Sequence, residues 1–176
     1  SMRITSLAAG FAILVSASGA LAAEKPDFTT AAKLLFAKPK LASDQPSHPV
    51  GFYAKGCLAG GVQLPINGPD WQVMRLSRNR NWGMPQLVRY IEKLANDTHT
   101  LDSWPGLLIG DMSQPRGGPM PSGHASHQIG LDVDIWYDPM PAHWLSRDER
   151  EKTSATSLTK AGTHFDMLPD RWPPGL

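Results

Sequence analysis

The central segment of this sequence reads Ser122-Gly-His-Ala-Ser-His-Gln-Ile-Gly-Leu-Asp-Val-Asp-Ile-Trp136, with two histidines and two aspartates inside the eleven residues from His124 to Asp134. Its second half alternates with a period of two, so Asp132 and Asp134 share one face of a predicted strand and apolar side chains share the other. Carboxylates on a packed strand need partners. Because His127 precedes Asp134 by seven residues across a glycine turn, an imidazole and a carboxylate can converge on one metal ion.

Other interpretations of this segment are weaker or remain open. The same alternation would also suit a solvated edge strand, with His124 and His127 as polar loop residues. A calcium loop is disfavoured, because Tyr137 and His143 stand where such a loop needs its glycine and its glutamate. The sequence contains no His-Glu-x-x-His and no Gly-x-Ser-x-Gly motif. Zinc held by mixed nitrogen and oxygen ligands, with one position open for water, fits these residues best.

The stretch from Gly110 to Trp136 resembles the penicillin-insensitive murein endopeptidases, zinc peptidases related to D-Ala-D-Ala carboxypeptidases and hedgehog domains. The likeness extends back through Tyr53-Ala-Lys-Gly-Cys-Leu-Ala-Gly-Gly61 and Trp71-Gln-Val-Met-Arg-Leu-Ser-Arg-Asn-Arg-Asn-Trp-Gly83. Several separate motifs in the same order make this resemblance far more specific than one histidine and one aspartate at a fixed spacing.

The resemblance implies that His127 and Asp134 are two zinc ligands. It also implies that a third ligand and the catalytic histidine come from a downstream His-x-His pair, which the 176 residues do not contain. We therefore expect the general base to be absent and these 176 residues to be nearly inactive by themselves. His124, three residues before His127, is expected to line the cleft.

By the same resemblance, the function is that of a periplasmic zinc peptidase that hydrolyses cross-links between D-alanine and diaminopimelate in peptidoglycan. The cross-link peptides would then be its partners, and zinc would polarise the scissile carbonyl. An alternative from another class is a non-catalytic peptidoglycan-binding or assembly protein that has lost the third zinc ligand. A purely structural zinc site is disfavoured, because such sites usually take four ligands, favour thiolates, and Cys57 is the single cysteine.

Candidate substrate-binding residues lie outside the central segment. Arg75, Arg78 and Arg80 could bind substrate carboxylates, since a guanidinium clamps a carboxylate with two hydrogen bonds. A solvated turn with cations on its rim is equally compatible with these arginines. Asp111 follows a short apolar run and could line the same site or cap its own loop. A formal charge of +1 and a pI near 7.9 give no electrostatic case for nucleic-acid binding.

The chain divides into three predicted segments. Residues 1–22 are typical of a secretory signal peptide, because Arg3 precedes an apolar run and Ala20-Leu-Ala22 offers a cleavage site. Glycines and serines interrupt that run, which disfavours a stable membrane span. Residues 23–49 form a proline-rich arm or linker, and residues 50–176 form the peptidase-like domain, which we expect to be truncated.

Export makes the single cysteine unusual. In an oxidising compartment, Cys57 suggests either a missing disulfide partner or a buried thiol. The family resemblance implies that the partner lies beyond Leu176.

The predicted fold is α+β, with a small, mostly antiparallel sheet, one main helix packed on it and the metal site on a central strand. The resemblance implies further C-terminal strands that are absent from this chain. Pro85 and the apolar spacing after it predict an amphipathic helix that ends near Asn96. The motif Ser146-Arg-Asp-Glu149 predicts a capping box and a short helix. Strands are expected at residues 51–61, 71–76, 106–109 and 131–136.

Overall fold

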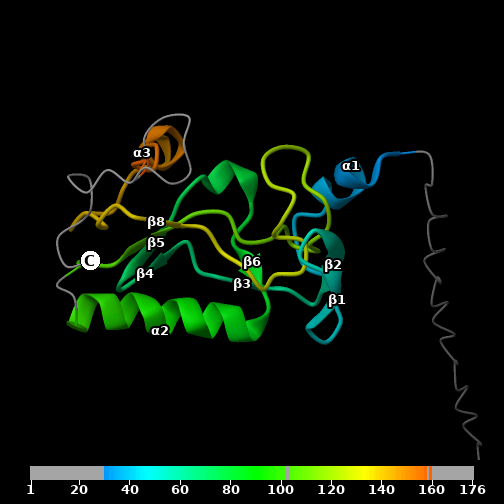
Figure 1. The fold of residues 1–176 in the computed structure, drawn as a ribbon, viewed down its shortest axis with the longest axis horizontal. Coiled ribbons are helices and arrows are strands. Elements are labelled where there is room, and N and C mark those ends of the chain that lie inside the picture. The colour runs from blue at the N-terminus through cyan, green and yellow to red at the C-terminus, as the bar shows by residue number, and fades with distance from the viewer. Residues whose placement is uncertain (1–29, 102–103, 158, 160–176) are drawn as a thin grey trace, which may run out of the picture.

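The computed structural model describes residues 30–101, 104–157 and 159. Its helices and strands are short apart from α2 (Figure 1). In chain order they are α1 (Ala32–Ala37), β1 (His48–Phe52), β2 (Lys55–Ala59), β3 (Val62–Gln63), β4 (Asn67–Gly68), β5 (Trp71–Val73), the 3-10 turn η1 (Leu76–Arg78), β6 (Trp82–Gly83), α2 (Pro85–Leu101), β7 (Leu107–Ile109), β8 (Ile135–Trp136) and α3 (Arg147–Lys152).

The main sheet has four strands in the order β4–β5–β7–β8. Its central pair, β5 and β7, is parallel, and the two outer pairs are antiparallel. The hairpin β1–β2 and the pair β3–β6 form two smaller antiparallel sheets. In Figure 1, α2 runs along one side of the main sheet and α3 lies on the other side. This layout confirms the predicted α+β class.

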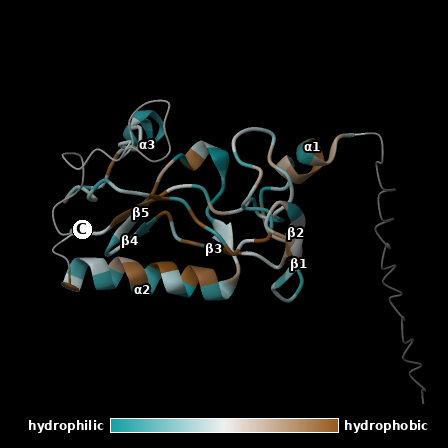
Figure 2. Cartoon of the chain, viewed as in Figure 1, coloured by the Kyte–Doolittle hydropathy of each residue, from teal (hydrophilic) through white to brown (hydrophobic). Residues whose placement is uncertain are grey.

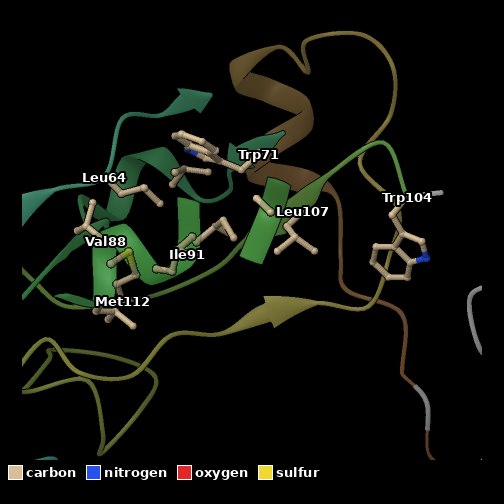
Figure 3. Close-up of a cluster of buried hydrophobic side chains, with 11 residues drawn as sticks. Leu64, Trp71, Val88, Ile91, Trp104, Leu107 and Met112 are labelled. Carbon is tan, nitrogen blue, oxygen red and sulfur yellow. The ribbon is translucent and has the colours of Figure 1, made fainter. Parts of the chain in front are cut away.

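The larger hydrophobic core lies between α2 and the main sheet. The brown stripe along α2 in Figure 2 reflects its amphipathic sequence, and the apolar face of that helix is buried. Figure 3 shows side chains from the helix and the strands meeting in this core. The fully or nearly buried members are Leu64, Trp71, Val73, Leu87, Val88, Ile91, Ala95, Trp104, Leu107, Ile109 and Met112.

A second, smaller core covers the opposite face of the sheet. Leu108 points away from its neighbours in β7 and packs with Met74 and Met140, as alternation along a strand requires. Trp136 and Leu145 pack against this cluster from outside. The main sheet is therefore covered on both faces over β7, which makes that strand a rigid support for the loop that follows it.

Several local predictions differ from the structure. The strand expected over residues 71–76 ends at Val73, because Arg75 takes a left-handed conformation and Leu76 begins η1. The expected strand over residues 51–61 is the hairpin β1–β2, which turns at Tyr53 and Ala54, and Val62–Gln63 pairs with β6 instead. The main helix continues to Leu101, past the expected end at Asn96. Thr98 and Thr100 lie in that extra turn, where their hydroxyls donate to main-chain carbonyls three and four residues earlier and so satisfy their own polar groups within the helix.

The strand expected to be central lies at the edge of the main sheet as the described residues form it, and it spans only Ile135–Trp136. Asp134 precedes this strand but still pairs with the chain after β7. Its N–H donates to the Asp111 carbonyl at 2.9 Å, and its carbonyl accepts from Gly110 N–H at 2.7 Å. This irregular pairing places Asp134 beside Asp111, two residues that are 23 apart in sequence.

Part of the predicted arm packs on the domain. A short helix, α1, forms where an apolar run suggested one, and the Phe36 ring lies directly against Gly118. Ser43 and Ser47 both hydrogen-bond to the main chain of Gly60. The predicted signal segment, residues 1–22, falls outside the described residues. Among the residues that the structure describes, no helix has the length and apolar character that a membrane span requires.

Candidate metal centre

Three side chains converge at the end of the loop that precedes β8. His124, His127 and Asp134 each offer one ligand atom, and these atoms lie within 4.8 Å of one another. Nε2 of His127 lies 3.4 Å from Oδ1 of Asp134, and Nε2 of His124 lies 3.3 Å from Oδ2 of the same carboxylate. The two oxygens of Asp134 therefore face the two imidazoles.

This donor set fits a small divalent cation of the zinc type. Ligands bound at about 2.0–2.2 Å to a tetrahedral ion lie roughly 3.3–3.6 Å apart. Each histidine lies at this distance from one oxygen of Asp134, and the three ligand atoms, one per residue, lie within 4.8 Å, so binding an ion would draw them closer together. Two imidazoles and one carboxylate are also the ligand types of hydrolytic zinc sites. The sequence predicted the convergence of His127 with Asp134 and placed His124 only as a cleft residue, whereas the structure brings all three together.

The sequence interpretation missed Asp132 as a residue of the site. Its Oδ2 accepts a hydrogen bond from the His127 main-chain N–H at 3.0 Å and lies 2.9 Å from Nδ1 of the His127 ring. The ring contact is an ion-pair approach without the alignment of a hydrogen bond. A carboxylate on the far nitrogen is the usual way to orient a metal-binding histidine. The two-residue spacing from Asp134 was the signal that could have identified this role.

The charges of the cluster shift two pKa values in opposite directions. Burial by itself lowers the pKa of His127, but the carboxylates of Asp134 and Asp132 outweigh it and raise that pKa above its ordinary value. The hydrogen bond from His127 lowers the pKa of Asp134, against the opposing effect of burial, and the charges of His124 and Arg78 lower it further. Without a metal, both shifts favour the state in which a protonated His127 faces an ionised Asp134.

Both shifts lead to a prediction about pH. His127 must lose its proton to bind a metal, so we expect metal affinity to fall as the pH drops through the raised pKa of His127, by about tenfold per pH unit below it. The metal-free protein should behave differently. The raised His127 pKa stabilises the fold below about pH 6.5, and the lowered Asp134 pKa stabilises it above about pH 4.

The measurements are chelator competition between about pH 5 and pH 8 and urea unfolding between about pH 2 and pH 8, with and without zinc. The stability contribution of the pair in the metal-free protein should be lost as the pH rises through the His127 pKa or falls through the Asp134 pKa. Metal affinity that stays constant across this range would contradict His127 as a ligand.

Asp111 links the metal cluster to two of the three candidate arginines. Its buried Oδ2 lies 2.8 Å from Nη1 of Arg78 and 2.7 Å from Nη1 of Arg80, and 3.6 Å from Nε2 of His124. Arg80 is buried and also donates to the Ser122 carbonyl at 2.8 Å, so it ties Asp111 to the loop that carries His124. The structure thus places Asp111 beside the predicted site.

The three arginines differ in what they contact. Arg80 is enclosed, whereas the side chain of Arg78 keeps 40% of its surface exposed beside Asp111. The guanidinium carbon of Arg75 lies 5.8 Å from the centre of the Trp136 ring, and Arg75 forms no ion pair with the three clustered residues. Arg78 is therefore the one of the three that combines proximity to the cluster with accessible donors.

Comparison with known proteins adds to this geometry. Residues 49–174 match the model of the family described as penicillin-insensitive murein endopeptidase. The chain belongs to this family. Proteins of that name include one from Yersinia pestis, 45% identical over 127 residues, and one from Klebsiella pneumoniae, 37% identical over 127 residues. One from Haemophilus influenzae is 41% identical over 99 residues.

The chain spans less than half the length of these relatives. The matches cover 72% of this chain and 45% of the Yersinia pestis and Klebsiella pneumoniae proteins, and 56% of this chain and 34% of the Haemophilus influenzae protein. The family membership confirms the resemblance that the motifs indicated.

Cys57 is half-buried with a free thiol, since the chain has one cysteine.

Proposed function

We propose that this chain carries the metal-binding residues of a zinc-dependent endopeptidase that hydrolyses D-alanyl-diaminopimelate cross-links of peptidoglycan in the periplasm. The observation that supports the proposal most is the cluster of His124, His127 and Asp134. It combines the ligand types of a hydrolytic zinc site with the position of the family motif. The names of the relatives supply the substrate class.

The residues of the cluster would have distinct roles. His127 and Asp134 would bind the zinc ion, and Asp132 would hold the His127 ring in place from its other nitrogen. His124 lies within reach of the same position but is more exposed, so it could complete the site or orient the substrate. When bound, zinc would polarise the scissile carbonyl and lower the pKa of a water molecule.

Arg78 is the candidate for binding substrate charge. The cross-link peptides carry carboxylates, and a guanidinium with free donors at the rim of the site could clamp one of them. Its bond to Asp111 fixes its position, and Asp111 is held in turn by the enclosed Arg80. In this arrangement Arg80 and Asp111 support the site and Arg78 contacts the substrate.

The proposal is tested by muropeptide release from purified sacculi, with added zinc and with a chelator. This chain is compared with a version extended at its C-terminus by a segment that contains the His-x-His pair implied by the family resemblance. We expect zinc-dependent release by the extended chain and release reduced by about 10²–10⁴-fold for these 176 residues, because the resemblance places the general base in that pair.

Each other outcome changes the proposal in a defined way. Comparable zinc-dependent release by the shorter chain would show that a histidine within it, most directly His124, completes the site. Binding to sacculi without release by either chain would favour the alternative, a non-catalytic peptidoglycan-binding protein. Release that is insensitive to the chelator would contradict the zinc mechanism.

A further inference from the structure

The main chain at His127 adopts a conformation that side-chain-bearing residues rarely take. Its φ is +63°, in the left-handed region, which among the described non-glycine residues is shared only with Arg75 and Asn79. Such a conformation persists where the surroundings hold it in place. One anchor is Asp132, which accepts the His127 N–H at 3.0 Å. A single hydrogen bond does not fix both sides of the residue.

The next residue, Gln128, supplies the other anchor through its side chain. It is 6% exposed, and its Nε2 donates to the carbonyls of Ala125 at 2.9 Å and Ala54 at 3.0 Å. Its Oε1 accepts the Gly56 N–H at 3.1 Å. The bond to Ala125 joins the residues on either side of His127, and the other two connect Gln128 to the β1–β2 hairpin, at the turn residue Ala54 and at Gly56 in β2.

The main chain of Gln128 is held equally firmly. Its N–H donates to the Tyr53 carbonyl at 3.2 Å, and its own carbonyl accepts from Gly118 N–H at 2.9 Å. A Cβ at Gly117 would lie 2.1 Å from that carbonyl oxygen, so the neighbouring loop fits tightly against it. The peptide that follows His127 therefore has little freedom to rotate.

The three hydrogen bonds of the Gln128 side chain require a carboxamide. The side chain donates two hydrogen bonds from one end and accepts one at the other, and a carboxamide has both functions. A carboxylate would retain the acceptor and lose both donors. An apolar side chain of the same length would lose all three bonds and leave two part-buried carbonyls and the Gly56 N–H without these partners.

We infer that Gln128 is a positioning residue that sets the affinity of the proposed metal centre by holding His127 in its left-handed conformation with Nε2 directed at Asp134. The inference rests on the proposed function, because it concerns the same metal. Residues that orient a metal ligand typically change metal affinity by 10- to 100-fold when replaced.

The test is cobalt binding by a Gln128→Met chain, which keeps the side-chain length and removes its polar atoms. Affinity is measured by chelator competition, and the visible absorption of bound cobalt reports ligand number and geometry. We expect about 10–100-fold weaker binding and an altered spectrum. Thermal unfolding of the metal-free chain, measured in parallel, separates lost stability from lost affinity.

Gln72→Met is the matched control. Gln72 is also a buried glutamine, 1% exposed, and its Nε2 donates to the His143 carbonyl at 3.0 Å. Its Oε1 accepts from the Leu145 N–H at 2.8 Å and from Arg150 Nη2 at 2.9 Å, so its side-chain hydrogen bonds go to α3 and the segment before it and not to Gln128 or the metal cluster. This control should lose stability like the Gln128 variant but keep the wild-type cobalt affinity and spectrum.

A folded Gln128→Met chain with wild-type cobalt affinity and spectrum would overturn the inference. Should that chain not fold, Gln128→Glu keeps the bond from Gly56 and adds a negative charge, which alone would strengthen cation binding. Weaker binding by this chain would therefore support lost positioning, and unchanged or tighter binding would overturn it.

The experiments also distinguish failure of the proposed function from failure of the inference about Gln128. If the unaltered chain binds no metal, the metal proposal fails, and a crystal structure of the metal-free Gln128→Met chain, or of Gln128→Glu, decides the inference. A His127 φ that stays near +63° with Nε2 still 3.4 Å from Asp134 would overturn it. A His127 that leaves the left-handed region supports it.

Discussion

A His127→Asn chain is expected to bind zinc at least about 100-fold more weakly than the unaltered chain. His127 offers the buried imidazole of the cluster, 3% exposed, and replacing even the residues that orient such a ligand typically costs 10- to 100-fold. Asparagine is chosen because it tolerates the left-handed conformation of this position, so the main chain is retained. The affinity is measured by competition with a chromogenic chelator.

The control for this substitution is His99→Asn. His99 lies in the last turn of α2, is exposed, and its nearest recorded ionic partner is Asp70 at 3.9 Å. Zinc affinity should be unchanged in the control. Thermal unfolding of both metal-free chains checks that they fold. Wild-type zinc affinity in a folded His127→Asn chain would remove the basis of the metal proposal.

Arg150→Met is expected to destabilise the fold by about 3–5 kcal/mol, because several buried acceptors lose their donors at about 1–3 kcal/mol each, and this is a large part of the total stability of a typical domain. Arg150 in α3 is 3% exposed, and all five of its N–H groups have acceptors. The acceptors are the carbonyls of Leu145, Ile66 and Val73, Asn67 Oδ1 and Gln72 Oε1.

None of these acceptors is a carboxylate, so the guanidinium charge is buried against neutral oxygens. Burial lowers the pKa of Arg150, and Arg147 lowers it further, but an arginine stays protonated in a protein. Methionine would fill much of the space and leave several buried oxygens without these donors, each at a cost of about 1–3 kcal/mol, and the costs are not additive.

Urea unfolding measures the effect as a lower transition midpoint at a similar slope. Arg147→Met, an exposed residue in the first turn of the same helix, should change stability by no more than about 0.5 kcal/mol. Arg150→Lys should fall between the two, because lysine keeps the charge but offers three donors. Equal midpoints for Arg150→Met and Arg147→Met would refute the role of Arg150.

The sequence by itself determined the features that depend on neighbouring residues. The apolar spacing after Pro85 identified α2, and Ser146 with Glu149 identified the start of α3, where both bonds of the capping box form. Both signals are local, because a helix satisfies its own main-chain hydrogen bonds and shows its buried face as a period of 3.6 residues. The spacing of His127 and Asp134 is also a local signal, since one short turn joins the two residues.

Features that join distant segments were decided by the tertiary structure alone. The hydrogen bonds of Arg150 reach β4 and β5 across more than 75 residues, and those of Gln128 reach the β1–β2 turn across more than 70. Arg78 and Arg80 look alike in sequence, yet Arg78 is exposed and Arg80 is enclosed. Both bind Asp111, which is more than 30 residues away in the chain, so their burial depends on long-range packing.

The position of β8 has the same physical cause. Alternation showed which residues of the segment share a face, but strand order depends on which main-chain groups pair, and an edge strand and a central strand can carry the same alternation. The pairing of Asp134 with Gly110 and Asp111 places the cluster at the edge of the main sheet. The sequence therefore determined the chemical nature of the candidate site, and long-range hydrogen bonding decided which neighbours hold it in place.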